Sequence, residues 1–240
     1  MIKINQINKE YVIGNKVVKD LTLEVRPGEI FGFLGPNGAG KTTTLKMITG
    51  VSSIDSGNIE INGVDITKEP LEAKKQFGFV PDSPDMFLRL KGIEYLNFMA
   101  KVYGVSYEDA KNRIEDYAKR FEIYDALNKQ IKDYSHGMRQ KIVIIGALIH
   151  EPRVWILDEP LTGLDPQSAH LLKEMMREHT AKGNTVLFST HVLEVAEKLV
   201  DRIGVIRKGE LIFVGTINEL KEKYNASDDS LEDLFLELTK

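Results

Sequence analysis

The stretch EIFGFLGPNGAGKTTTLKMITG, residues 29–50, decides the fold of this chain. It opens with an apolar run typical of a buried strand, turns through a glycine-rich segment, and leaves in a helical pattern. The segment Gly35–Thr43 fits the pattern G-x-x-x-x-G-K-[ST]. Glycines let the backbone curl so that several N–H groups face one point, and the helix start adds its positive end. We therefore expect a cradle for a phosphate cluster between a strand and a helix.

Two side chains at the end of this segment carry chemistry suited to a nucleotide. Lys41 supplies a point charge for β- and γ-phosphates, and the Thr42 hydroxyl is placed to ligate Mg²⁺. A glycine-rich turn that holds no ligand is the alternative interpretation. The strand before the turn and the helix after it favour the cradle.

A second motif, VWILDEP at residues 154–160, brings two carboxylates to the end of a strand. Four consecutive apolar residues predict a strand that is buried on both faces. Asp158 can hold Mg²⁺ through water, and Glu159 is free to polarise an attacking water molecule. Taken alone, Asp-Glu-Pro could simply start a turn. The phosphate cradle predicted at residues 35–43 favours the interpretation as a Mg²⁺-binding and catalytic motif.

A third motif, FSTH at residues 188–191, ends another apolar strand with His191. Ligands of parallel α/β sheets collect at the carboxyl ends of the strands. A lone histidine in this position could equally be a structural hydrogen-bonding group.

Strand-like and helix-like patterns divide the rest of the chain. Residues 21–25 alternate apolar and polar side chains, and Asn62-Gly63 is a hairpin signal, so the first sixty residues predict an antiparallel sheet. Residues of about 89–133 change to apolar spacings of three and four, which predicts a helical insert. Strands separated by helical patterns then predict a parallel, covered sheet. These strands are expected at residues 154–157, 185–189 and 202–206.

Bulk properties exclude several classes of protein. The 240 residues carry a net charge of −4, which does not favour a chain held to nucleic acid by a positive field. The chain has no cysteine, so disulfides and a cysteine nucleophile are excluded. Its longest apolar run is far shorter than the roughly 20 residues that span a bilayer. We expect a cytoplasmic protein that would serve a membrane only through a partner.

Together and in this order, the motifs resemble the nucleotide-binding subunits of ATP-binding cassette (ABC) transporters. The resemblance covers about residues 1–215. It implies an α/β fold with a P-loop NTPase (RecA-like) core, an antiparallel β subdomain and an α-helical subdomain inserted at about 89–133. Residues 216–240 would form a C-terminal helical tail, which either docks on its own domain or contacts a partner. The apolar face of this tail would comprise Leu231, Leu234, Phe235 and Leu238.

The resemblance also implies roles for individual residues. Tyr11 matches the aromatic residue that stacks on adenine, Gly35–Thr43 the Walker A loop, residues 154–159 the Walker B strand, Leu161–Asp165 the D-loop, and His191 the switch histidine. The implied catalytic residues are Lys41, Glu159 and His191. The implied Mg²⁺ ligands are Thr42, Asp158 and Asp82. The implied ATP-binding residues are Tyr11, Gly35, Pro36, Asn37, Gly38, Ala39, Gly40, Lys41, Thr42, Thr43, Ser135 and Gly137.

The stretch YSHGMRQK, residues 134–141, starts a helix directly before the most apolar run of the chain. A Ser and a Gly make a good helix start and leave its first N–H groups without partners in the local sequence. An ordinary helix cap is one interpretation. By the resemblance, the stretch takes the place of the family's signature, usually Leu-Ser-Gly-Gly-Gln. Ser135 and the donors around Gly137 would then cap the γ-phosphate of ATP held by a second nucleotide-binding subunit.

Three positions depart from the family pattern. His136 and Met138 replace the usual Gly and Gln of the signature, which leaves the Ser and the second Gly in place. Asp82 stands where the family usually has a Gln that touches Mg²⁺ or water. A carboxylate can bind Mg²⁺ but adds negative charge near the γ-phosphate. The alternative for Asp82 is a turn-forming residue before Ser83-Pro84.

By the resemblance, we expect an ATP-binding and ATP-hydrolysing subunit, with ATP and Mg²⁺ as cofactors, that drives a separate integral-membrane subunit. Export is favoured over import, and the expected location is the inner face of the cell membrane. A soluble cassette-type ATPase that regulates nucleic acid or ribosome function is the alternative from another class. A cassette that binds ATP without turnover is a third. Lys41, Asp158, Glu159 and His191 argue against this third alternative.

Overall fold

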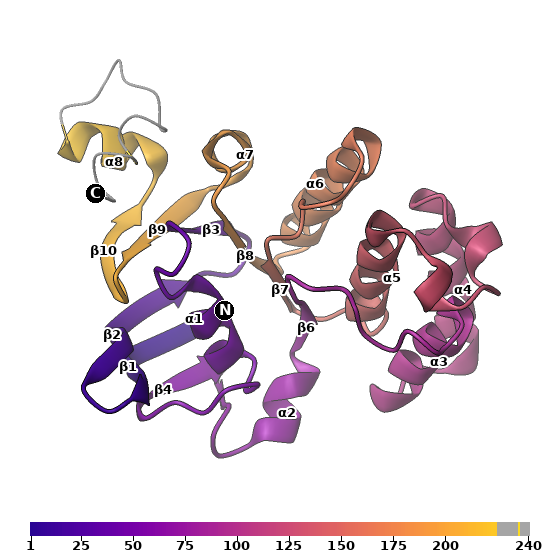
Figure 1. Ribbon diagram of the computed structural model, residues 1–240, viewed down its shortest axis with the longest axis horizontal. Helices are drawn as coiled ribbons and strands as arrows, with labels where there is room; N and C mark the ends of the chain where they lie inside the picture. The colour runs from indigo at the N-terminus through magenta and orange to yellow at the C-terminus, as the bar shows by residue number, and fades with distance from the viewer. Residues whose placement is uncertain (225–234, 236–240) are drawn as a thin grey trace.

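Two sheets organise the chain in a computed structural model that describes residues 1–224 and residue 235 (Figure 1). The smaller sheet is antiparallel, with strand order β2-β1-β4-β5. Its strands are β1 (Ile2–Val12), β2 (Asn15–Val25), β4 (Ser56–Ile61) and β5 (Val64–Asp65). Asn62 and Gly63 turn between β4 and β5 with φ of 51° and 82°, which is the hairpin turn that the sequence predicts.

The larger sheet has the order β10-β9-β3-β8-β7-β6. Its neighbouring strands run parallel except at one edge, where β10 is antiparallel to β9. The strands are β3 (Ile30–Leu34), β6 (Phe77–Val80), β7 (Val154–Asp158), β8 (Thr185–Thr190), β9 (Arg202–Arg207) and β10 (Glu210–Gly215). Because β3, β8 and β7 are neighbours, their carboxyl ends lie side by side and bring three of the predicted motifs together.

Helices cover the larger sheet, and a group of helices extends the molecule to one side of it. In Figure 1, α3, α4 and α5 form a group at one end of the molecule, opposite α8. The helices are α1 (Lys41–Ile48), α2 (Pro70–Lys75), α3 (Gly92–Val102), α4 (Tyr107–Arg120), α5 (His136–Leu148), α6 (Pro166–Ala181), α7 (Leu193–Leu199) and α8 (Ile217–Lys223). Two short 3₁₀ helices, η1 (Tyr124–Ala126) and η2 (Ile131–Asp133), complete the path from α4 to α5. None of the helices in the described part of the chain has both the length and the apolar composition to cross a membrane.

The core is split between the two faces of β7. Val154 and Ile156 pack with the antiparallel sheet and α1, whereas Trp155 and Leu157 pack with α5, α6 and the helices of residues 92–133. All five residues of β7 are buried. A strand covered on both faces is the arrangement that its continuous apolar run predicts.

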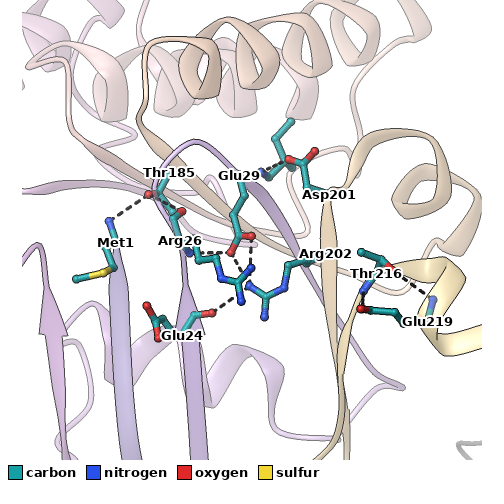
Figure 2. A network of polar contacts seen from close by, with 10 residues as sticks. Met1, Glu24, Arg26, Glu29, Thr185, Asp201, Arg202, Thr216 and Glu219 are labelled. Atoms are coloured by element: carbon teal, nitrogen blue, oxygen red, sulfur yellow. Dashed lines mark hydrogen bonds and ion pairs between the residues drawn. The ribbon is translucent and has the colours of Figure 1, made fainter. Parts of the chain in front are cut away.

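A buried ion pair fixes the start of β3 (Figure 2). The Arg202 guanidinium lies 3.1 Å from Glu29 Oε1, with both side chains largely buried. Glu29 Oε1 also accepts from the Arg26 backbone N–H at 2.7 Å, and the Ile30 N–H donates to Asp201 at 2.7 Å. These contacts hold the strand that leads into the glycine loop to the start of β9.

The α/β fold, with its antiparallel and parallel sheets, agrees with the prediction, and the three predicted later strands are confirmed to within one residue at their ends. The patterns missed β10 and α2. Of the predicted tail face, only Phe235 lies among the described residues, and it is buried in a cluster with Leu193 and Phe213.

Candidate functional site

The glycine loop joins β3 to α1 and bends back on itself. Gly40 has φ of 108°, and a Cβ at this position would lie 3.0 Å from the Val17 carbonyl oxygen, so both its backbone angle and its surroundings require glycine. A Cβ on Gly35 would lie 2.6 Å from the Ile206 carbonyl oxygen. These close approaches explain why the loop needs glycine on both sides of its turn.

Lys41 is buried at the first position of α1. Its Nζ donates to the carbonyl oxygens of Gly35 at 2.6 Å and Pro36 at 3.3 Å, and lies 3.8 Å from Glu159 Oε1. Burial lowers the pKa of Lys41, while Glu159 and Asp158 act in the opposite direction. The ammonium group is therefore held between the loop carbonyls and the two acids at the end of β7, Asp158 and Glu159.

Asp158, at the end of β7, is almost completely buried. Its Oδ1 accepts from the Ser189 hydroxyl at 2.5 Å, and its carboxylate also bonds the Thr42 hydroxyl. Burial raises the pKa of Asp158, and these two hydroxyls act against that rise. Two of the predicted Mg²⁺ ligands, Thr42 and Asp158, are thus in direct contact.

Glu159 follows β7 in a left-handed backbone conformation, with φ of 48°. Its N–H donates to the Ser189 hydroxyl at 3.1 Å. Its carboxylate lies 3.0 Å from His191 Nδ1 through Oε2 and 3.8 Å from Lys41 Nζ through Oε1. Glu159 is therefore oriented by one residue from each of two other segments.

A cavity of about 340 Å³ opens at the glycine loop. The structure brings these predicted residues to its wall: Pro36, Asn37, Gly38, Gly40, Lys41, Thr42, Thr43, Asp82, Glu159 and His191. Asp158 lies buried behind it, in contact with Thr42. Val17 and Thr162 also line this cavity. Thr162 belongs to the predicted D-loop segment Leu161–Asp165, whereas Val17 was not singled out from the sequence. Val17 reaches the cavity from an antiparallel strand, which no local pattern indicates.

Tyr11 lies at the end of β1 with 58% of its surface exposed. It is not among the residues that line the cavity, and Lys9 Nζ lies 5.5 Å from its ring centroid. A second cavity, of about 640 Å³, shares Val17 and Gly38 with the first and carries three lysines on its wall. These are Lys16, Lys19 and Lys208, which the motifs did not indicate.

The stretch 134–141 lies outside both cavities. Ser135 caps α5, and its hydroxyl accepts from the Met138 N–H at 3.3 Å, so the prediction that the first N–H groups lack local partners is wrong for Met138. A Cβ on Gly137 would lie 2.8 Å from the Gly163 carbonyl oxygen. Lys141 Nζ pairs with Asp165 at 3.1 Å. The start of α5 therefore packs against the segment Leu161–Asp165, which follows Glu159.

Comparisons with known proteins identify the family. A family model described as "ABC transporter" matches residues 18–162. The chain is 38% identical over 226 residues to the ABC-type transporter ATP-binding protein EcsA of Bacillus subtilis (strain 168), covering 94% of this chain and 92% of that protein. It is 37% identical over 221 residues to the Nod factor export ATP-binding protein I of Cupriavidus metallidurans, covering 92% and 72%.

A solved structure described as the ATP binding subunit of an ABC transporter has the same fold. It matches with a TM-score of 0.95 and 34% sequence identity, over 100% of both chains. The ABC resemblance and the P-loop NTPase fold predicted from the motifs are confirmed by these matches. This chain belongs to the ABC transporter family, and it is an ATP-binding subunit, the ATPase component of such transporters.

Proposed function

We propose that the cavity at the glycine loop takes the phosphates of ATP and that Glu159 is the general base of hydrolysis. The observation that carries this proposal is the position of the Glu159 carboxylate on the cavity wall, between Lys41 and His191. A carboxylate held on two sides is oriented toward a water molecule beside the terminal phosphate. Lys41 supplies charge for the phosphates, and His191 positions Glu159.

The donor set of the site suits Mg²⁺. Thr42, Asp158 and Asp82 offer only oxygen atoms, which Mg²⁺ prefers, and no group of three or more His, Asp or Glu side chains among the described residues is arranged to bind a metal. Phosphate and water oxygens would therefore complete its coordination. When bound, Mg²⁺ neutralises charge on the β- and γ-phosphates.

The second component of the proposal is a dimer that encloses ATP. Ser135 and Gly137 lie outside the cavity of their own chain, and Gly137 and Lys141 of the same helix lie against the segment Leu161–Asp165. In an isologous pair, this surface of one chain would face the glycine loop of the other. ATP favours the closed pair because it contacts both halves.

The third component is a membrane-spanning subunit that docks between the Asp82 loop and α3. Apolar side chains are exposed there: Phe87 at 45% and Phe98 at 46%, with ring centroids 5.8 Å apart. Met86 and Val102 extend the same exposed set. Exposed apolar groups gathered in this way suit a partner surface. Closure of the two nucleotide-binding subunits would be transmitted to the membrane subunit at this apolar surface.

We propose that the complex exports its substrate from the cytoplasm and that this chain lies at the inner face of the cell membrane. One relative carries the name of an export protein, and this supports the direction of transport. The alternative, a regulator of nucleic acid or ribosome function, is not favoured, because the relatives are named as transporter or export proteins and the chain is acidic.

The test is the substitution Glu159→Gln, which keeps the shape of the side chain and removes its basicity. We expect this variant to bind ATP as well as the parent chain does and to hydrolyse it about 10²–10⁴-fold more slowly, which is the usual contribution of a general base to the rate. Phosphate release and nucleotide binding are measured on the chain with its membrane partner. Glu108→Gln is the matched control, since Glu108 is exposed on α4. Full turnover in the Glu159→Gln variant would remove Glu159 from its assigned role.

The same variant tests the dimer. The chain has no cysteine, so Ser135→Cys together with Asn37→Cys introduces the only thiols. In the Glu159→Gln background with ATP and Mg²⁺, we expect a crosslink between two chains, and little crosslinking without nucleotide. Binding of ATP without any interchain crosslink would contradict the dimer and leave the ATP site intact.

A further inference from the structure

A separate cavity of about 360 Å³ lies at the other end of β7 from the ATP site. Trp155, the second residue of the strand, lines it, whereas Asp158 ends the strand at the ATP site. Residues of α4 form one side and residues of α6 form the other, with the end of α5 between them. The volume falls in the range of small-molecule sites, about 300–1,000 Å³.

Two nitrogen atoms of this lining have no hydrogen-bond partner in the described part of the chain. They are Trp155 Nε1 and His179 Nε2, and both are shielded from solvent. Trp155 is completely buried, and its ring meets the His179 ring edge-on with centroids 5.8 Å apart. The indole N–H can only donate, so it requires an acceptor. Buried polar groups are rarely left unpaired, and a bound acceptor at this cavity would supply the missing partner of the indole N–H.

The charges of the lining are balanced. The lining includes three cations, Arg113, Arg120 and Lys182, and three carboxylates, Asp116, Glu151 and Glu178. Four of these six are already paired: Arg113 with Glu151 at 2.7 Å, and Arg120 with Glu178 at 2.9 Å. The other two, Lys182 and Asp116, are exposed to solvent and have no ion-pair partner among the described residues. The lining therefore has one unpaired charge of each sign, and a net-neutral ligand with both charges would match it better than an anion or a cation.

Asn112 and three largely apolar side chains complete the lining. Tyr117, Leu148 and Met175 line the same cavity, which suits a short hydrocarbon skeleton. We propose that this cavity binds a small zwitterion of the α-amino-acid class with an apolar side chain. Its carboxylate accepts from Trp155 Nε1 and faces Lys182, and its ammonium group faces Asp116. The helix α4 lies in the helical segment, whereas α6 packs on the larger sheet. The bound molecule therefore contacts both parts and stabilises their relative position.

The chain supplies its own reporter, since Trp155 is its only tryptophan. L-Leucine is the probe, with two truncated relatives as controls: 4-methylpentanoate, which lacks the ammonium group, and 3-methylbutylamine, which lacks the carboxylate. We expect leucine to change the Trp155 emission saturably. Each truncated compound should bind more weakly by at least about tenfold, since each loses one charged contact.

Two variants assign the contacts. Lys182→Met and Asp116→Asn should each raise the leucine dissociation constant by about tenfold or more. Lys173→Met is the control, because Lys173 lies on α6 outside the cavity lining. Far-UV circular dichroism shows that each variant is folded. Emission that leucine does not change, or an equal response to all three compounds, overturns the proposal and leaves water as the partner of both nitrogens. An unaltered leucine response in Lys182→Met overturns it as well.

Discussion

Removal of one buried hydroxyl, by Ser189→Ala, should weaken the fold at the ATP site. Ser189 is completely buried in β8. Its Oγ donates to Asp158 Oδ1 at 2.5 Å and accepts from the Glu159 N–H at 3.1 Å. The substitution removes both bonds and leaves a buried carboxylate and a backbone N–H without this partner.

The size of the effect follows from the two bonds. A hydrogen bond to a charged group contributes about 1.5–3 kcal/mol and a neutral one about 0.5–1.5 kcal/mol, so the loss should be roughly 2–4.5 kcal/mol. At about 2–4 °C per kcal/mol for a chain of this length, the melting temperature should fall by roughly 4–18 °C.

The loss should also depend on pH. Burial already raises the pKa of Asp158 in the folded chain above its unfolded value of 3.8, and removal of the Ser189 donor raises it further. Because the folded pKa is the higher one, ionised Asp158 costs stability above that pKa, and this cost disappears as pH falls through it. The difference in unfolding free energy between the Ser189→Ala variant and the parent chain should therefore become smaller as the pH is lowered.

Urea unfolding followed by circular dichroism measures both effects. Ser83→Ala is the control, because Ser83 is exposed and such surface changes usually stay within about 0.5 kcal/mol. A loss below about 1.5 kcal/mol for Ser189→Ala, the lower limit for a hydrogen bond to a charged group, would refute the reasoning. A loss that is independent of pH would show that Asp158 does not carry the charge assumed for it.

Two further predictions concern packing and acid stability. A Cβ on Gly78 would lie 2.1 Å from the Ala147 carbonyl oxygen, so Gly78→Ala should force β6 away from α5 and cost about 1–3 kcal/mol or more in urea unfolding. Gly104→Ala, with φ of 68° but open space, measures backbone strain without a clash, and a loss below about 1 kcal/mol for Gly78→Ala would contradict the packing effect. Burial lowers the pKa of His150 to about 4, so its neutral form stabilises the fold above pH 6.5 and this contribution is lost as pH falls toward 4. His150→Gln should therefore reduce the fall in unfolding free energy between pH 7 and 4.5 by about 1–3 kcal/mol, and an unchanged fall would contradict the assignment.

Elements with a complete local signal could be predicted from the sequence. The glycine loop carries its turn, its helix start and its charged residue within nine positions, and the apolar run of β7 shows its burial directly. β10 was missed because it is an edge strand whose partner is set by the fold. α2 has six residues, too few for a periodic pattern.

The site itself was predictable only in part, because its geometry joins distant segments. The motif FSTH pointed to His191, yet Ser189 in the same motif bonds the Asp158 carboxylate and the Glu159 backbone N–H, and nothing local indicates these bonds. Val17 reaches the cavity from β2 through the packing of the two sheets. Ser135 was expected to leave its neighbouring N–H groups free, but helix capping is a stronger local preference, and its hydroxyl serves Met138.

The place of β3 at the centre of the larger sheet bears on how the chain is made. Both of its neighbours, β8 and β9, come late in the sequence, and about 150 residues separate Leu34 from Thr185. At about 5–20 residues per second, a ribosome needs roughly 8–30 s to cover that distance. During this interval the apolar strand IFGFL has no partner from its own sheet, and it is a target for chaperones that shield nascent chains. The segment that carries the ATP loop is thus translated early and completed late.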